Sequence, residues 1–200
     1  MCGIVGYIGK KDASQIILDG LSKLEYRGYD SSGIAIVNTS NNIKWSKKKG
    51  RLSVLEEILA KDPIEGSIGI GHTRWATHGE PSDNNAHPHI NKNETIAVVH
   101  NGIIENYMEL KEMLIAEGYV FCSETDTEVI VHLIDKYYNG NLLDAVYLAV
   151  NHLRGAYALG IVSSNHPDEL IAVRNESPLI IGVGEDEYFV ASDVPAILSY

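Results

Sequence analysis

The residue nearest the start of this chain that could do chemistry is Cys2, in the opening stretch MCGIVGYIG. A free thiol has a pKa of about 8.5 and an α-amino group a pKa of about 7.7–8.0, so a chain that starts at Cys2 carries a nucleophile and a base on one residue. Methionine aminopeptidase accepts small second residues, so removal of Met1 would expose this pair. Taken alone, Cys2 is better interpreted as a small hydrophobic residue at the head of a strand.

A second set of candidates is the group of histidines within residues 72–100, namely His72, His78, His87, His89 and His100. Imidazoles are common zinc ligands, and the two in HPH lie on one side of an extended segment. The sequence nevertheless has no HExxH, no CxxC and no regular ligand spacing. A metal hydrolase is therefore a weaker hypothesis, and we expect no metal site.

Composition excludes several other classes of protein. The 200 residues are 44% hydrophobic, enough for the core of a single domain. The net charge of -11 gives no electrostatic support for binding nucleic acid or an anionic membrane. The apolar runs are strand-sized and no basic segment precedes the first, so we expect neither a membrane span nor a signal peptide. Two cysteines form no disulfide framework, which favours a cytoplasmic location, and Cys122 in YVFCSE is expected to be an inert, mostly buried thiol.

The elements that must position these residues follow from hydrophobic periodicity. Short apolar or alternating runs predict strands over residues 2–8, 33–38, 42–47, 68–72, 95–100, 156–163, 169–174, 179–183 and 187–191. Helical periodicity predicts helices over residues 12–25, 51–61, 104–116, 126–138 and 141–152. Turns are expected at Asn41-Asn42 and over residues 165–168, and the pattern favours an α+β fold with largely antiparallel sheets. The stretch 73–93 lacks periodicity, and long loops of this kind are usually functional.

Longer motifs accompany the leading CGIVG. They are RGYDSSG at 27–33, GHTRWATHGEP at 71–81, HNGIIEN at 100–106 and SETDTE at 123–128. Together they resemble the class II, N-terminal-nucleophile glutamine amidotransferases, and most closely the glutaminase domains of glutamine–fructose-6-phosphate aminotransferases. The amidophosphoribosyltransferase branch resembles the chain less, because it reads like LQHRGQ where this chain has LEYRGYD and lacks the TRWATHG wording. The resemblance runs from Cys2 to ASDVPAIL at 191–198.

This resemblance implies a fold, a reaction and partners. The fold is a four-layer αββα sandwich in which residues 1–200 form one glutaminase domain. The reaction is hydrolysis of L-glutamine to glutamate and ammonia through a thioester on Cys2, with the Cys2 α-amine as base and no cofactor. The family uses the ammonia on fructose 6-phosphate in a C-terminal sugar-phosphate isomerase domain, for amino-sugar synthesis. We expect that domain to be absent from this chain and the full-length enzyme to be a homodimer.

Asn101 and Gly102 place a side-chain amide next to an unshielded backbone N–H. By resemblance they form the oxyanion hole that stabilises the tetrahedral intermediate, whereas Asn-Gly alone would indicate a type I′ hairpin turn. Arg27 follows a helical segment whose C-terminal end favours a cation, and the resemblance places it close to Cys2, where it organises the N-terminal region. A non-catalytic binding module with the same fold is an alternative, against which intact Cys2 and Asn101-Gly102 argue.

Recognition of glutamine requires a cation for its carboxylate and an anion for its ammonium group. Arg74 suits the carboxylate because its planar fork can make two parallel hydrogen bonds, and Asp126 suits the ammonium group. An alternative for Asp126 is helix capping, because Ser123, Thr125 and Asp126 all have side chains suited to the N-cap of the predicted helix 126–138. Capping of the helix and binding of the ammonium group both remain open for Asp126, since one residue at a helix start can do both.

The remaining candidates belong to the TRWATHG loop. By resemblance, Thr77 and His78 add donors around the glutamine carboxylate, although His78 could equally be an ordinary loop histidine. Trp75 resembles the family tryptophan that gates the route of ammonia towards the second active site. Loop packing is the common alternative for a large aromatic side chain.

Met1 provides a first test. If Met1 stays attached, the Cys2 nitrogen is a peptide amide without basicity, so the mechanism loses its base. We expect untrimmed protein to be nearly inactive as a glutaminase, and removal of Met1 to restore activity without changing the fold. Glutamate release is measured for both forms after intact mass has confirmed each; equal rates would contradict the role of the α-amine.

Overall fold

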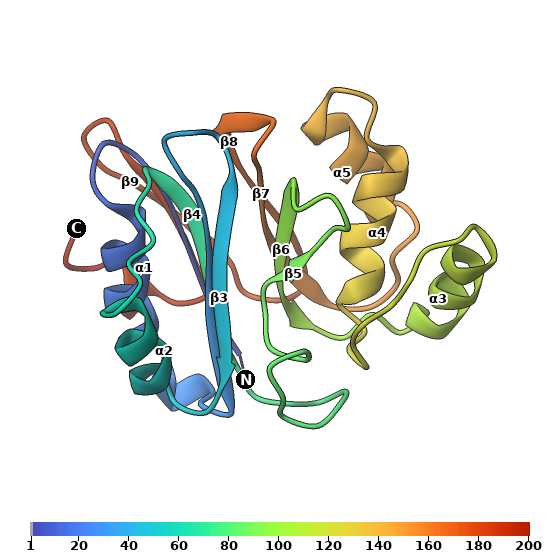
Figure 1. Ribbon diagram of the computed structural model, residues 1–200, viewed down its shortest axis with the longest axis horizontal. Coiled ribbons are helices and arrows are strands. Elements are labelled where there is room, and N and C mark those ends of the chain that lie inside the picture. Colours follow the sequence, from blue (N-terminus) through green and yellow to red (C-terminus); the bar gives the residue numbers. More distant parts are fainter. Residues whose placement is uncertain (1) are drawn as a thin grey trace.

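Two antiparallel β-sheets pack face to face between outer layers of helices in the computed structural model of this chain, which describes residues 2–200 (Figure 1). Helices α1 (Ala13–Ser22) and α2 (Leu52–Leu59) cover one sheet, and α3 (Tyr107–Ala116), α4 (Glu128–Tyr137) and α5 (Leu142–Val150) lie on the side of the other. This arrangement confirms the α+β, αββα expectation. The prediction about Met1 concerns a residue outside the described ones. Within residues 2–200, none of the helices combines the length and hydrophobicity needed to cross a membrane.

The larger sheet has the strand order β3-β2-β4-β1-β10-β9, with antiparallel neighbours throughout. Its strands are β1 (Gly3–Ile8), β2 (Ser31–Val37), β3 (Ile43–Lys49), β4 (Ile68–Arg74), β9 (Ile180–Val183) and β10 (Tyr188–Ala191). Strand β1 is internal, and its first residue, Gly3, pairs with Thr73 near the end of β4. The start of β1 therefore lies beside the C-terminal end of β4.

The smaller sheet has the order β5-β6-β7-β8 and is also antiparallel. Its strands are β5 (His89–Ile90), β6 (Ile96–Gly102), β7 (Tyr157–Ser163) and β8 (His166–Asn175). Strand β5 lies inside the stretch that we expected to be irregular. The turn expected over residues 165–168 is wrong, because β8 already begins at His166 and the turn is Ser164-Asn165. Pro167 is compatible with this strand because β8 is at the edge of the sheet.

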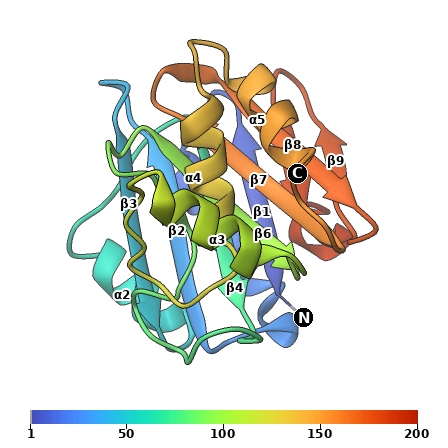
Figure 2. The same cartoon turned by 90° about the vertical axis from the view of Figure 1, so that its right-hand side faces the viewer.

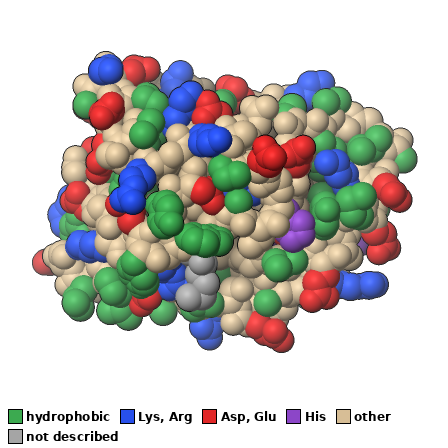
Figure 3. Space-filling view, turned by 90° about the horizontal axis from the view of Figure 1, so that it is seen from below, with side chains coloured by type: hydrophobic (Ala, Val, Ile, Leu, Met, Phe, Trp, Pro, Cys, Tyr) green, Lys and Arg blue, Asp and Glu red, His purple; other side chains and the backbone are tan. Residues whose placement is uncertain are grey.

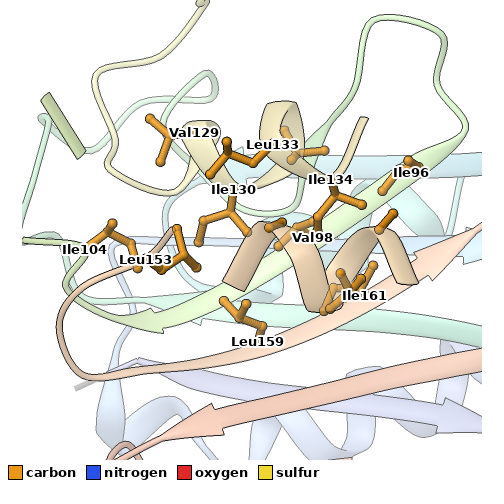
Figure 4. Close-up of a cluster of buried hydrophobic side chains, with 14 of the residues drawn as sticks. Ile96, Val98, Ile104, Val129, Ile130, Leu133, Ile134, Leu153, Leu159 and Ile161 are labelled. Atoms are coloured by element: carbon orange, nitrogen blue, oxygen red, sulfur yellow. The ribbon is translucent and has the colours of Figure 1, made fainter. Parts of the chain in front are cut away.

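Hydrophobic clusters fill each interface between layers. Helix α1 packs so closely on β4 that a Cβ added at Gly71 would lie 2.3 Å from Cγ2 of Ile17, so this position requires glycine. Figure 4 shows the cluster of buried hydrophobic side chains between the smaller sheet and the helices on its side, which includes Ile96, Val98, Ile130, Leu133, Leu159 and Ile161. Buried helix faces of this kind supply most of the stability of such short helices.

The alternation of side chains along two facing strands brings polar groups together at one end of the sandwich. On β4, Ile68 and Ile70 face the smaller sheet, so His72 and Arg74 continue the same face. On β6, Ala97 and Val99 face the larger sheet, and Asn101 follows on that face. Apolar residues thus fill the middle of the space between the sheets, and polar residues occupy its end.

Candidate active site

Cys2 precedes β1 at the end of the sandwich where β4 and β6 finish. Figure 2 shows that β1 begins at the lower end of the molecule. Its first residue, Gly3, pairs with Thr73 of β4. Seen from below, this end carries hydrophobic side chains near its centre and charged groups of both signs around them (Figure 3). Residues far apart in the sequence therefore meet around Cys2.

The Cys2 thiol lies against the backbone of Trp75. The Trp75 N–H donates to the Cys2 sulfur over 3.2 Å. Burial raises the pKa of the Cys2 thiol, while this hydrogen bond and the nearby Arg74 cation act in the opposite direction. Because the pKa is raised overall, the thiol is protonated at neutral pH, and a base must remove its proton before the sulfur can act as a nucleophile.

The Cys2 carbonyl oxygen accepts hydrogen bonds from two candidates. Arg27 donates through Nε over 3.2 Å, and Asn101 donates through Nδ2 over 3.1 Å. Arg27 is itself held by an ion pair with Asp193, at 2.9 Å between Nη1 and Oδ2. The structure therefore places both Arg27 and Asn101 directly beside the candidate nucleophile.

Asn101 and Gly102 close strand β6 and do not form a hairpin turn. Gly102 still pairs with Tyr157 on β7, so the alternative of a type I′ turn is wrong. Its φ of +122° and the 2.0 Å that would separate an added Cβ from the Ala156 oxygen both require glycine here. The amide of Asn101 has two N–H bonds, and only one is needed for the Cys2 carbonyl.

Arg74 lies at the end of β4 and is 4% exposed. Its Nη2 donates to the backbone oxygens of His78 and Gly79, the latter at 3.1 Å. Its Nη1 is buried and has no hydrogen-bond partner among the described residues. A buried guanidinium with an unused nitrogen is costly, which makes this group a candidate to receive an anion.

Asp126 is buried but does not cap the helix that follows it. Helix α4 begins at Glu128, and its N-cap residue, Thr127, makes no side-chain capping bond. One Asp126 oxygen, Oδ2, accepts from the Ile104 N–H over 2.8 Å. The other, Oδ1, lies 4.0 Å from Nδ1 of His100. The capping alternative for Asp126 is therefore wrong, because its carboxylate is committed to the loop that follows β6.

Ser123 and Thr125 also do not cap α4. The Ser123 hydroxyl donates to Oε2 of Glu128 over 2.5 Å, and Thr125 contacts Nε2 of His89 over 3.0 Å. The capping works in the reverse sense, because the Glu128 carboxylate accepts from the backbone N–H groups of Cys122 and Ser123. Their side-chain types made Ser123, Thr125 and Asp126 candidates for the N-cap, but none of the three caps α4.

The loop after Arg74 carries the other candidates. Trp75 is 49% exposed, and its ring meets Tyr29 edge-on with 5.6 Å between centroids. Thr77 is exposed and contacts Nδ1 of His78 over 3.4 Å, while the His78 ring packs against Tyr107. The Arg74 guanidinium therefore contacts the backbone carbonyl of His78 and not its imidazole ring.

Asp30 is a functional candidate that the sequence did not identify. Its carboxylate accepts from the Ala76 N–H and from the Ser31 hydroxyl, and its own N–H donates to the Arg74 oxygen over 3.1 Å. Asp30 therefore fixes the loop that carries Trp75. The motif RGYDSSG contains this residue, but nothing in its local sequence indicates a partner forty-odd residues away.

The histidines are hydrogen-bonded inside the fold. His87 and His100 both contact the Thr127 hydroxyl, at 3.1 Å and 2.9 Å. Burial lowers the pKa of His72 to about 3 and lowers those of His87, His89 and His100 as well, so all are neutral at physiological pH. Within residues 2–200, no group of three or more His, Cys, Asp or Glu side chains is placed to hold a metal ion.

Cys122 differs from its expectation. Its side chain is exposed, whereas we expected a mostly buried thiol. The apolar neighbours in YVFCSE suggested burial, but this segment runs irregularly before α4 and is held through its backbone by Glu128. In this irregular segment the apolar neighbours do not determine the exposure of the Cys122 side chain.

Comparisons with known proteins give a match to a protein family. A family model described as a glutamine amidotransferase domain matches residues 72–199. Over 200 residues the chain is 63% identical to the glutamine–fructose-6-phosphate aminotransferase (isomerizing) of Clostridium perfringens. It is 66% and 56% identical to proteins of that name from Clostridium acetobutylicum and Thermus thermophilus. All of this chain but only 33% of each relative is covered, so the chain spans about a third of their length.

Solved structures share the fold. The glutamine phosphoribosylpyrophosphate amidotransferase of B. subtilis, complexed with ADP and GMP, matches with a TM-score of 0.86 at 31% identity. A structure described as the allosteric regulatory enzyme of purine biosynthesis matches with a TM-score of 0.87 at 32% identity. Each match covers 98% of this chain and 42% of the other, which confirms the antiparallel sandwich.

The anchoring by Asp30 can be tested directly. In Asp30→Ala, the backbone N–H of Ala76 loses a charged acceptor worth about 1.5–3 kcal/mol, so we expect amide exchange over residues 75–79 to accelerate roughly 10- to 100-fold. Asp83→Ala is the matched control, because Asp83 also accepts from a backbone N–H but holds the end of β3, at Lys49, and not residues 75–79. Unchanged exchange at residues 75–79 would contradict the anchoring role.

Proposed function

The chain belongs to the glutamine amidotransferase domain family, and from that membership we propose that it hydrolyses L-glutamine to glutamate and ammonia through a thioester on Cys2. One observation carries the proposal. The Cys2 thiol, the Asn101-Gly102 pair and the unpartnered Nη1 of Arg74 belong to one end of the sandwich. A nucleophile, an oxyanion donor and a carboxylate receptor are the groups that attack on an amide of free glutamine requires.

The α-amine of Cys2, once Met1 is removed, is the base in this proposal. It takes the thiol proton, and the sulfur attacks the side-chain amide carbon of glutamine. The amide oxygen becomes an anion that accepts from the second Asn101 N–H and from the Gly102 N–H. The C–N bond then breaks, the nitrogen leaves as ammonia with the proton from the α-amine, and water hydrolyses the thioester to glutamate. The raised thiol pKa supports this scheme, because an unaided thiol would remain protonated.

The two ends of glutamine are assigned to the two buried charges. Arg74 receives the α-carboxylate through its unused nitrogen, and Thr77 and His78 add donors from the adjoining loop. Asp126 receives the α-ammonium group, and Oδ1 is the oxygen available for it, because Oδ2 is bound by Ile104. Arg27 positions the Cys2 backbone and has no reactive role.

Residues 1–200 correspond to about a third of the relatives, so the destination of the ammonia is a wider proposal. We assign this chain to the glutaminase part of a glutamine–fructose-6-phosphate aminotransferase, whose remaining domain, a sugar-phosphate isomerase, would use the ammonia to form glucosamine 6-phosphate. Trp75, half-exposed beside the thiol, is the residue assigned to gate the transfer. We also propose a homodimer for the full-length enzyme and a cytoplasmic location.

Covalent labelling tests the nucleophile. With Met1 removed, the chain should release glutamate from L-glutamine, and 6-diazo-5-oxo-norleucine should label Cys2 and abolish the activity. Cys122 is an internal control, because its thiol is exposed and lies outside the site. Peptide mass mapping distinguishes the two cysteines. Labelling of Cys122 with Cys2 untouched, or unchanged glutamate release in Cys2→Ala, would overturn the assignment.

Substrate binding is tested at the two charges. Arg74→Ala and Asp126→Ala should each raise the KM for glutamine steeply, because each leaves one charged end of the substrate unpaired in a buried site, a penalty of a few kcal/mol. Arg174→Ala is the control, since Arg174 lies on the edge strand β8 and its side chain donates to the backbone oxygen of Leu179, just before β9. Steady-state glutamate release gives the values; unchanged kinetics in either variant would remove that residue from the binding site.

A further inference from the structure

A buried hydrogen bond joins the two sheets next to Cys2. Nε2 of His72, on β4, lies 2.9 Å from Oδ1 of Asn101, on β6. His72 is 1% exposed and Asn101 is 7% exposed, so solvent does not compete for either group. The same Asn101 amide donates through Nδ2 to the Cys2 carbonyl oxygen over 3.1 Å. A contact across the sandwich therefore ends at the candidate nucleophile.

The partners fix the direction of this chain of hydrogen bonds. An amide oxygen only accepts, so His72 must carry its proton on Nε2. The carbonyl of Cys2 also only accepts, so the amide nitrogen of Asn101 must face Cys2. If the Asn101 amide turned over, its oxygen would meet the Cys2 oxygen and its N–H bonds would meet the N–H of His72. The contact between the two oxygens would be repulsive in any case, and the contact with His72 would be repulsive while its proton is on Nε2. The Cys2 carbonyl and this form of His72 therefore favour the same orientation of the Asn101 amide.

Fixing the amide leaves one defined donor. One N–H of Asn101 points to the Cys2 carbonyl, and the second is free to face the substrate. Oxyanion donors act by being oriented before the reaction, so that no reorganisation is needed when charge develops. A donor held by one bond to Cys2 alone would rotate about its side-chain torsions, and the contact with His72 removes that freedom.

We propose that His72 is a positioning residue that holds the Asn101 amide with its N–H bonds toward Cys2 and the substrate amide. The inference rests on the function proposed above. His72 does not touch the substrate, and it acts only through Asn101. Because burial lowers the pKa of His72 to about 3, the ring stays neutral and its donor role is constant across the physiological pH range.

His87 provides a matched control. Its ring is also buried and lies against His72, with 4.2 Å between centroids. It bonds Thr127 and the His100 backbone, not Asn101. A general loss of packing in this histidine group would therefore affect His72→Leu and His87→Leu alike, whereas loss of the amide contact affects only His72→Leu.

The experiment measures glutamate release by the Met1-free chain and its variants. In His72→Leu we expect kcat to fall roughly 10- to 100-fold, with KM little changed. This loss is smaller than the loss of about 10²–10³-fold that is typical when an oxyanion donor itself is removed. His72→Gln should recover much of the rate, because its longer amide can donate to Asn101. His72→Asn, whose amide is shorter, should not. His87→Leu should keep kcat close to that of the unsubstituted chain.

A double-mutant comparison decides whether His72 acts through Asn101. In an Asn101→Ala background, His72→Leu should cause no further loss of kcat. An equal additional loss in that background, or an unchanged kcat in His72→Leu alone, would overturn the inference. If His72→Leu does not fold by circular dichroism, the Gln and Asn variants carry the same comparison. Failure of the unsubstituted chain to release glutamate would instead overturn the proposed function, so the two failures are distinguishable.

Discussion

The backbone carbonyl of Cys2 is the group on which the geometry of the site depends. Residues at a chain end are usually poorly ordered unless other parts of the fold hold them. Here Arg27 donates to this oxygen from the segment after α1, and Asn101 donates from the opposite sheet. Because both donors meet at one oxygen, the start of β1 is fixed against both sheets. The thiol can then keep its contact with Trp75.

Burial sets the charges around this point. Burial lowers the pKa of four imidazoles near the site and raises the pKa of the Cys2 thiol, so these five groups are uncharged at neutral pH. The Arg74 guanidinium donates to two backbone carbonyl oxygens, and its Nη1 has no hydrogen-bond partner among the described residues. A carboxylate bound at this nitrogen, as proposed for glutamine, would offset the cost of leaving it without a partner.

The sequence predicted the sandwich well because its signals are local. Alternation in β4 and β6 and the apolar faces of α1 and α4 are readable within a few residues. Strand β5 gave no such signal, because it has only two residues and so cannot show a hydrophobic alternation. Cys122 was misjudged for a similar reason, because its apolar neighbours lie in an irregular segment.

The site was predictable only where a motif carried it. Asp126 was identified by its motif, but its partner Ile104 is 22 residues away, so local reasoning left helix capping open beside binding. Asp30 was missed, and His72 was considered only as a metal ligand, because their contacts with Ala76 and Asn101 are made across the fold. Residue type shows what a side chain can donate or accept, whereas the fold decides which partner it meets.

The hydrogen bonds of Arg74 would couple the binding of a carboxylate to the order of the loop over residues 75–79. The same guanidinium that offers Nη1 to a carboxylate holds the loop after it through the carbonyls of His78 and Gly79. That loop supplies the Trp75 N–H against the Cys2 sulfur. A carboxylate on Arg74 would therefore stiffen the guanidinium, the loop and the environment of the thiol together, because they share one chain of hydrogen bonds. In the proposed function, recognition of one end of the substrate would thus reach the nucleophile through these hydrogen bonds.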